Sequence, residues 1–181
     1  MQECGFLVHI CRGYMRCYLC LGSNLGNTEE ILAKAIAAIC EHPKITLAAK
    51  SGIYKTEPQG DKNQEWFANQ VLAIEYACAQ PLEYAADLLM SYLLGVEAGM
   101  GRSRDETRRF GPRVIDIDII LLENFRISTS LVEVPHKRAQ ERAFVLIPLQ
   151  EIAPHISIQN MPIDEALSRL EYRLEGNKIY Q

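Results

Sequence analysis

The sequence lacks any apolar run long enough to cross a membrane. Among its 181 residues, no stretch approaches the roughly 18 consecutive apolar residues that a spanning helix needs. The apolar patch at residues 6–10 follows Glu3, is interrupted by His9 and precedes no small-residue cleavage site, so it does not fit a secretory signal. We therefore expect a cytoplasmic protein with no membrane partner.

The familiar motifs of nucleotide and metal binding are also missing. The chain has no G-x-x-x-x-G-K-[ST] phosphate loop and no complete dinucleotide fingerprint. Its single C-x-x-C, Cys17 to Cys20, lies in a predicted strand, where residues three apart point to opposite faces and could share a metal only across a turn. Because no export signal accompanies the six cysteines, we expect reduced, buried thiols rather than a disulfide framework.

Neither sign of charge dominates the composition. The chain has 19 Lys and Arg against 23 Asp and Glu, a net charge of −4, which argues against bulk binding of nucleic acid. Hydrophobic residues make up 48% of the chain and charged residues 23%, which excludes disordered, collagen-like and coiled-coil proteins. The length predicts one domain. We expect residues 15–181 to form it, with residues 1–14 as an N-terminal extension.

Hydrophobic periodicity predicts the order of the first six elements. Strands are expected at residues 16–21, 45–55, 66–77 and 114–122. Helices are expected at residues 29–41, with Thr28 as N-cap, and at residues 81–99. The order βαββαβ matches the ferredoxin-like sandwich, an α+β fold with a four-stranded antiparallel sheet and two helices on one face.

The rest of the chain predicts additions to this sandwich. We expect a short hairpin before Pro135, helical turns over residues 139–149 and a helix over residues 163–170. No internal repeat or linker suggests a second domain.

The chemistry of the sequence is gathered in one segment. Five arginines lie within residues 101–113, and Asp116 and Asp118 follow on the most hydrophobic predicted strand. Their spacing places both carboxylates on one face, with Cα atoms about 6.6 Å apart. Neighbouring carboxylates repel unless a cation bridges them, and Mg²⁺ prefers such oxygens together with substrate phosphates. Since guanidinium groups bind phosphate, the segment predicts phosphoryl-type transfer.

Two other interpretations of this segment stay open. The arginines could neutralise the aspartates in a structural ion-pair cluster, since surface ion pairs are common and contribute little energy. The arginine-rich loop could also make the protein a non-catalytic RNA-binding ferredoxin-like module. That alternative lacks an aromatic platform on a central strand and leaves the two aspartates facing a polyanion.

Several motifs of the sequence resemble one known family. They are Gly22-Ser-Asn-Leu-Gly26, Tyr54-x-Thr56-x-Pro58-x-Gly60, Phe67-x-Asn69, Gly101-Arg-x-Arg…Arg-Phe-Gly-Pro-Arg-x-x-Asp-x-Asp118, Val134-Pro-His136, Arg142-x-Phe144 and Pro148-Leu-x-Glu-Ile-Ala-Pro154. Together they resemble the 6-hydroxymethyl-7,8-dihydropterin pyrophosphokinases of folate biosynthesis, in order from about residue 15 to about residue 154.

The resemblance implies an activity and a set of roles. Members transfer the terminal diphosphate of ATP to the pterin hydroxymethyl oxygen and release AMP. Two Mg²⁺ ions would bind Asp116 and Asp118, which are catalytic residues together with Arg102 and Arg113. The residues implied for ATP binding are Glu97, Arg104, Arg109, His136 and Arg142. Those implied for pterin binding are Thr56, Glu57, Pro58, Gln59, Phe67, Asn69 and Phe144, with the two phenylalanines stacking on the ring.

The chain departs from the family pattern at a few positions. Phe67 stands where relatives often have Tyr, and Phe110 where Trp is common. The arginine-rich loop is slightly longer than in some relatives, so either Arg108 or Arg109 takes its inner role. We expect a monomer whose two polar loops, residues 57–65 and 102–112, close over ATP and pterin.

Overall fold

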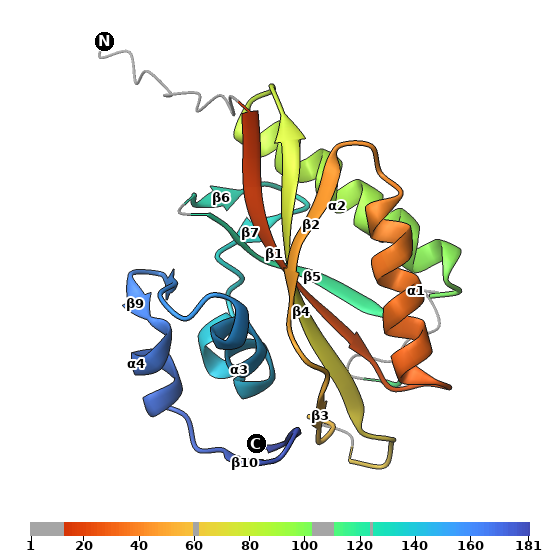
Figure 1. The fold of residues 1–181 in the computed structure, drawn as a ribbon, viewed down its shortest axis with the longest axis vertical. Helices are drawn as coiled ribbons and strands as arrows, with labels where there is room; N and C mark the ends of the chain where they lie inside the picture. Colours follow the sequence, from red (N-terminus) through yellow and green to blue (C-terminus); the bar gives the residue numbers. More distant parts are fainter. Residues whose placement is uncertain (1–12, 60–61, 103–110, 124) are drawn as a thin grey trace.

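The structure, a computed structural model, describes residues 13–59, 62–102, 111–123 and 125–181. These residues form an α+β fold in which helices lie on both sides of a mixed sheet (Figure 1). The elements are β1 (Gly13–Ser23), α1 (Thr28–Cys40), β2 (Ile45–Lys50), β3 (Tyr54–Thr56), β4 (Phe67–Cys78), α2 (Leu82–Gly99), β5 (Asp116–Leu122), β6 (Ile127–Ser128), β7 (Glu133–Val134), the 3₁₀ helix η1 (Ala139–Glu141), α3 (Ala143–Ile152), β8 (Ser157–Ile158), β9 (Met161–Pro162), α4 (Ile163–Ser168), β10 (Arg173–Glu175) and β11 (Lys178–Tyr180).

The main sheet has seven strands in the order β10-β11-β3-β4-β1-β5, and β2 also pairs with β4. β1 is antiparallel to both β4 and β5, whereas β11 is parallel to β3. The four-stranded antiparallel sheet expected from the sequence is therefore enlarged by the β10–β11 hairpin and contains one parallel pairing. The hairpin strands are three residues long and mostly exposed, so they carry no hydrophobic period that a sequence could reveal.

The single strand predicted at residues 45–55 is divided into β2 and β3. Between them, Ser51 donates its N–H to the Val71 carbonyl (2.9 Å) and accepts the Val71 N–H on its hydroxyl (3.0 Å). The Gln70 amide donates to the Ser51 carbonyl at 2.6 Å. The Ser51 hydroxyl thus takes the place of a backbone carbonyl as acceptor of the Val71 N–H, and the Gln70 amide takes the place of a backbone N–H as donor to the Ser51 carbonyl. The chain can therefore bend at Ser51 while its backbone polar groups stay hydrogen-bonded.

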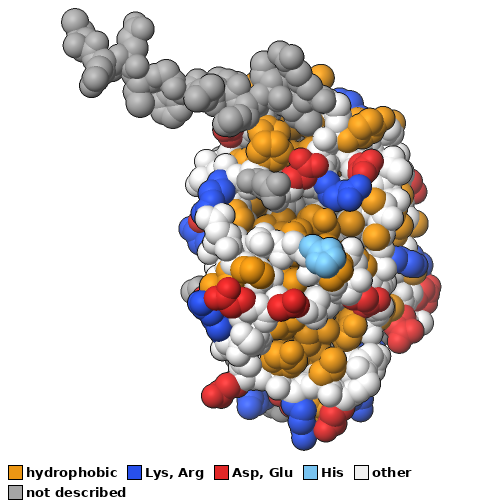
Figure 2. All heavy atoms as spheres, turned by 60° about the vertical axis from the view of Figure 1, so that its left-hand side comes forward, with side chains coloured by type: hydrophobic (Ala, Val, Ile, Leu, Met, Phe, Trp, Pro, Cys, Tyr) orange, Lys and Arg blue, Asp and Glu red, His pale blue; other side chains and the backbone are white. Residues whose placement is uncertain are grey.

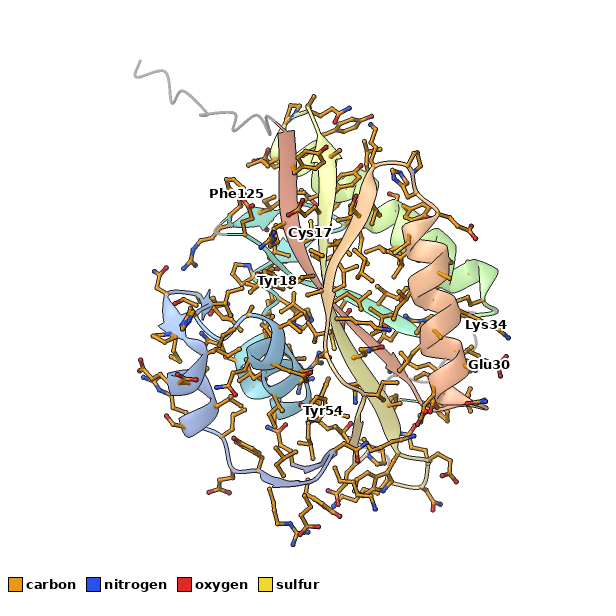
Figure 3. All side chains as sticks on the ribbon, in the orientation of Figure 1. Cys17, Tyr18, Glu30, Lys34, Tyr54 and Phe125 are labelled. Carbon is orange, nitrogen blue, oxygen red and sulfur yellow. The ribbon has the colours of Figure 1, made fainter. Side chains whose placement is uncertain are left out.

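Two apolar cores lie on the two faces of the sheet. Met15, Cys17 and Leu19 of β1 pack in the core that α1 and α2 cover, whereas Tyr18 and Cys20 pack in the core that α3 and α4 cover. Cys17 and Tyr18 are labelled in Figure 3. β1 is consequently buried on both sides, and its two C-x-x-C thiols belong to different cores, as predicted.

The cysteines are only partly as expected. Cys17, Cys20 and Cys40 are free, and burial raises the pKa of the Cys17 and Cys20 thiols, which keeps them protonated. Cys78 is disulfide-bonded, so the prediction of reduced thiols throughout is wrong. That prediction rested on the lack of an export signal. Such a signal says where a protein is sent, whereas the fold decides which thiols come close enough to form a disulfide.

The helices begin and end close to the predicted residues. The N-cap of α1 is Asn27, whose side chain accepts the Glu30 N–H, rather than the predicted Thr28. α2 starts directly after Pro81, and the predicted hairpin before Pro135 is present as β6 and β7. Within the described ranges, no helix combines the length and apolarity that crossing a membrane requires.

Candidate active site

β5 places its two aspartates on the sheet face that α3 covers. Asp116 is opposite Gly22 and Asp118 is opposite Cys20, whose side chain packs in the core on that face. Ile117 of the same strand packs in the opposite core. The two carboxylates therefore share a face, as their spacing predicts, and the isoleucine beside them anchors the strand.

Arginines from two sides pair with Asp116. Arg102 Nη1 donates to Asp116 Oδ1 at 2.5 Å and to the Glu97 carboxylate, and Arg113 Nη1 donates to Asp116 Oδ2. Glu97 is only 2% exposed, and its Oε1 also accepts the Ile117 N–H at 2.7 Å. This carboxylate from α2 thus joins the arginine to the backbone of β5.

Asp118 has weaker compensation than its neighbour. Arg142 Nη1 lies 3.9 Å from Asp118 Oδ2, beyond hydrogen-bonding distance. Burial, followed by the Asp116 charge, raises the pKa of Asp118 to about 6. Nε of Arg142 and Nε of Arg102 are buried without a hydrogen-bond partner in the part of the chain that the structure describes. The cluster thus offers a carboxylate suited to a further cation and guanidinium donors suited to an anion.

The donor set fits Mg²⁺ only in company with a substrate. Across the described residues, no group of three or more His, Cys, Asp and Glu side chains is placed to hold a metal ion. Asp116 and Asp118 supply two hard oxygen ligands, and Mg²⁺ commonly binds one or two carboxylates together with substrate phosphates and waters. The residues present therefore fit a magnesium–phosphate complex better than a closed protein metal site.

His136 stands near the same cluster as a neutral donor. Its backbone N–H donates to the Ile120 carbonyl at 2.9 Å, and its Nδ1 accepts the Arg138 N–H at 3.1 Å. Burial and then the charge of Arg142 lower the pKa of His136. Since Nδ1 acts as an acceptor, the neutral imidazole carries its proton on Nε2, an N–H of the kind that donates to anions.

A second polar cluster lies on the same face, two strands away. The Asn69 amide donates to the Thr56 hydroxyl at 2.8 Å, and both side chains are buried. The register places Asn69 opposite Gly22, which in turn is opposite Asp116. Adjacent strands lie about 4.8 Å apart, so the Cα atoms of Asn69 and Asp116 are about 10 Å from each other.

The other predicted pterin residues lie on β4, on α3 and in the loop that follows β3. Phe67 opens β4 opposite Thr56, and the half-buried Phe144 lies in the first turn of α3 with the Arg142 guanidinium 5.5 Å from its ring centroid. Glu57, Pro58 and Gln59 follow β3 in the loop towards β4. The stacking of a ring between the two phenylalanines stays a prediction.

Asn24 is a residue of the site that the sequence analysis did not single out. It is 2% exposed and accepts the Arg113 N–H at 2.8 Å, while its amide donates to Gln64 Oε1 at 2.9 Å and to the Glu65 carbonyl at 3.2 Å. One side chain thereby joins the turn after β1 to the loops that precede β4 and β5. The only sequence signal was its place in Gly22-Ser-Asn-Leu-Gly26, which as a strand exit is weak evidence.

A cavity of about 500 Å³ opens where these three loops meet. Its lining comprises Asn24, Leu25, Lys62, Asn63, Gln64, Glu65 and Pro112. Arg104 and Arg109, predicted to bind ATP, lie outside the described residues, as do Arg108 and Phe110. The closure of loops 57–65 and 102–112 accordingly stays a prediction.

Comparisons with known proteins point to one family. The model of the 7,8-dihydro-6-hydroxymethylpterin-pyrophosphokinase (HPPK) family matches residues 18–154. The 2-amino-4-hydroxy-6-hydroxymethyldihydropteridine pyrophosphokinase of Methylorubrum extorquens is 42% identical over 156 residues, which cover 86% of this chain and 94% of that one. The Bacillus subtilis protein of the same name is 37% identical over 139 residues, covering 77% and 78% of the two chains.

A solved structure shows the same fold at low identity. An HPPK-DHPS protein in complex with substrates aligns with a TM-score of 0.63 and 13% identity, covering 87% of this chain and 43% of the other. The chain therefore spans less than half of that longer protein. None of these comparisons supports the RNA-binding alternative, and Figure 2 shows Lys and Arg side chains interspersed with Asp and Glu on the face turned to the viewer.

Proposed function

The chain belongs to the HPPK family, and we propose that the carboxylate–arginine cluster on β5 is the site at which it transfers the pyrophosphoryl group of ATP to hydroxymethyldihydropterin. It is an ATP-dependent pyrophosphokinase of folate biosynthesis. One observation carries the assignment of the site. Two carboxylates share a face with Arg142, whose buried Nε has no hydrogen-bond partner among the described residues.

The proposed roles follow the geometry of the two clusters. Asp116 and Asp118 would hold Mg²⁺, two ions in our proposal, which would neutralise phosphate charge and lower the pKa of the attacking hydroxyl. Arg102 and Arg113 fix the orientation of Asp116 through its two oxygens. The ATP-binding residues would be Glu97, Arg104, Arg109, His136 and Arg142.

The reaction needs no nucleophile from the protein. The hydroxymethyl oxygen of the pterin attacks the β-phosphorus of ATP, the bond from that phosphorus to the α,β-bridging oxygen breaks, and AMP leaves. The side chains bind, orient and stabilise charge, which is the main contribution available in phosphoryl transfer. Arg142 Nε and His136 Nε2 are the donors we assign to the phosphate oxygens.

The second cluster suits the pterin. Thr56 and Asn69 supply buried hydrogen-bonding groups for the polar edge of the heterocycle. We assign the same edge to the loop residues that follow Thr56, which are Glu57, Pro58 and Gln59. Phe67 and Phe144 would stack on the two faces of the ring. The pairing of Asn69, Gly22 and Asp116 across three strands sets Asn69 at a fixed separation from Asp116, and a pterin bound at Asn69 would share it. This separation supports transfer between substrates bound side by side.

We further propose a ferredoxin-like core formed by β1, α1, β2, β4, α2 and β5. Support comes from the antiparallel pairing of β2 with β4, of β4 with β1 and of β1 with β5, and from the core shared with α1 and α2 on one face. We also propose that residues 15–181 act as one domain and that the enzyme is a cytoplasmic monomer that binds no nucleic acid.

The nucleotide product tests the reaction. We expect purified protein with ATP, Mg²⁺ and 6-hydroxymethyl-7,8-dihydropterin to form AMP and pterin diphosphate in equal amounts. Excess EDTA should abolish the reaction, and added Mg²⁺ should restore it, because phosphate and carboxylates need the cation to approach each other. Nucleotides separated by anion-exchange chromatography give the answer. Formation of ADP, or full activity in EDTA, would contradict the mechanism.

Gly22 tests the pterin end of the site. A Cβ at this position would lie 3.1 Å from Asn69 Oδ1, so Gly22→Ala should displace the amide while leaving the extended backbone unstrained. We expect KM for the pterin to rise about fivefold, the factor that corresponds to one neutral hydrogen bond of about 1 kcal/mol, with KM for ATP unchanged. Steady-state kinetics with each substrate varied in turn measure both constants.

The exposed Gly95 of α2 offers a matched control. A Cβ there meets no atom within 4 Å, so Gly95→Ala should leave both constants unchanged and stabilise the helix by up to about 1 kcal/mol. If Gly22→Ala raised neither constant, or raised only KM for ATP, Asn69 would not read the pterin.

A further inference from the structure

Arg142 is the single residue between η1 and α3, and its N–H donates to the Ala139 carbonyl at 3.4 Å. It follows η1 and precedes α3, and its φ and ψ of −124° and 103° are extended. Its carbonyl accepts the N–H groups of Val145 and Leu146 (3.0 Å each), but its side chain caps neither helix. The first N–H groups and last carbonyls of helices need partners from elsewhere.

One side chain directly after the β10–β11 hairpin supplies partners on both sides of this junction. Gln181 Oε1 accepts the Ala143 N–H at 2.8 Å, and Gln181 Nε2 donates to the Glu141 carbonyl at 2.8 Å. The same amide thus holds the residue before and the residue after Arg142. It caps the end of η1 and the start of α3 at once.

The position of Gln181 is set by the strand that carries Thr56. β11 runs parallel to β3 with Ile179 opposite Thr56, and the Ile179 side chain is buried in the core under α3. Asn177 accepts the Lys55 N–H on its carbonyl (2.8 Å) and donates its amide to the Ile53 carbonyl (3.2 Å). The register of the hairpin is therefore fixed two and four residues before Gln181.

Aromatic contacts tie the hairpin to the other side of the site. The Tyr180 ring meets the Trp66 ring edge-on, with centroids 5.2 Å apart, and Trp66 directly precedes Phe67. The Arg173 guanidinium carbon lies 4.2 Å from the Tyr180 ring centroid, over the ring. The hairpin thus contacts the segments that carry Thr56, Phe67 and Arg142, although it lies beyond residues 18–154, which the family model matches.

We propose that Gln181 is a positioning residue of this enzyme, which holds Arg142 in the orientation that places its guanidinium over Asp118 and the phosphates. The inference rests on the proposed role of Arg142 in binding ATP. It gives the β10–β11 hairpin a function, because the hairpin couples the strand beneath the pterin to the arginine that faces the nucleotide. Small displacements of such a group lower the rate strongly.

A double-mutant cycle tests the proposal on the full chain. We expect Gln181→Ala to lower kcat/KM for ATP about fivefold. The substitution removes the half-buried hydrogen bond from the Ala143 N–H and the exposed one to the Glu141 carbonyl, which together contribute about 1 kcal/mol to holding Arg142 in place. In the Arg142→Ala background the same substitution should change kcat/KM less than twofold, since Gln181 acts through that arginine. Glu175→Gln, which removes an exposed ion pair in the same hairpin, is the control and should match the parent enzyme.

The outcomes separate this inference from the assignment of the site. Equal effects of Gln181→Ala in both backgrounds would indicate a merely structural role and overturn the proposal, as would an equal loss in Glu175→Gln. If Gln181→Ala alone changed nothing while Arg142→Ala lowered activity, the positioning role would be wrong and the ATP site would stand. If Arg142→Ala itself left kcat/KM unchanged, the assignment of Arg142 would be wrong. Thermal unfolding of each variant verifies that the fold is intact.

Discussion

Replacing Asp116 with asparagine is expected to lower kcat for AMP formation by about a thousandfold, the upper range for loss of one preorganised electrostatic contact in an active site. The carboxylate accepts from Arg102 on one oxygen and from Arg113 on the other, and with Asp118 it forms the pair that suits Mg²⁺. Asparagine keeps the shape but has one acceptor oxygen and no charge. Its NH₂ group would face a guanidinium that can only donate.

The same substitution separates catalysis from structural ion pairing. If the cluster served stability alone, Asp116→Asn would lower the melting temperature while the folded fraction kept its rate. If the cluster holds the metal–phosphate complex, kcat falls in a protein that is still folded. Single-turnover AMP formation and thermal unfolding, measured on the same preparation, distinguish the two.

Asp164 provides the matched control for this experiment. It is an exposed aspartate of α4 that accepts a hydrogen bond from Gln150, on an element that contributes no proposed site residue. Asp164→Asn should retain full kcat. A kcat for Asp116→Asn within tenfold of the parent enzyme would show that Asp116 is not a catalytic residue.

Replacing Glu97 with alanine is expected to lower the free energy of unfolding by about 3 kcal/mol, the cost typical of breaking a buried ion pair from one side. The carboxylate is 2% exposed and accepts from Arg102 and from the Ile117 N–H. Its loss leaves the largely buried Arg102 with less compensation and a buried N–H without this acceptor. Urea titration followed by circular dichroism measures the change.

Two further variants of α2 refine this result. Glu97→Gln keeps an oxygen for the Ile117 N–H and should cost about half as much, because only the charge is lost. Glu83→Ala, in the exposed first turn of the same helix, should change stability by less than about 0.5 kcal/mol. If Glu97→Ala were as stable as Glu83→Ala but raised KM for ATP, Glu97 would act by direct nucleotide contact rather than through Arg102.

The sequence predicted the catalytic face of β5 because strand geometry has a fixed period. Asp116 and Asp118 had to share a face whatever their surroundings were, and the isoleucines between and beside them had to pack on the other. The sequence could not predict which arginine would meet which carboxylate. Arg102 and Arg113 converge on Asp116 only because α2 ends beside β5 and Glu97 is anchored to the Ile117 N–H.

The break between β2 and β3 shows a second kind of limit. The sequence predicted one strand over residues 45–55, but the chain bends between β2 and β3, where Gln70 and Glu151 supply partners from distant elements. Glu151 of α3 accepts the Gly52 N–H at 3.0 Å and the Tyr54 hydroxyl at 2.9 Å. Tyr54 is labelled in Figure 3. Such contacts carry no local pattern, as is also true of the β10–β11 hairpin.

The sequence by itself determined the α+β order of elements, the opposite facing of Cys17 and Cys20 on β1 and the types of side chain that carry the chemistry, because periodicity and residue type act locally. Only the tertiary structure decided how those side chains meet. The alignment of Asn69, Gly22 and Asp116, the junction of three loops at Asn24 and the hold of Gln181 on Arg142 depend on strand register and on loop paths between residues far apart in the chain. Those pairings are set by the packing of the whole fold, since no local propensity favours one register over its neighbours until a buried face selects it.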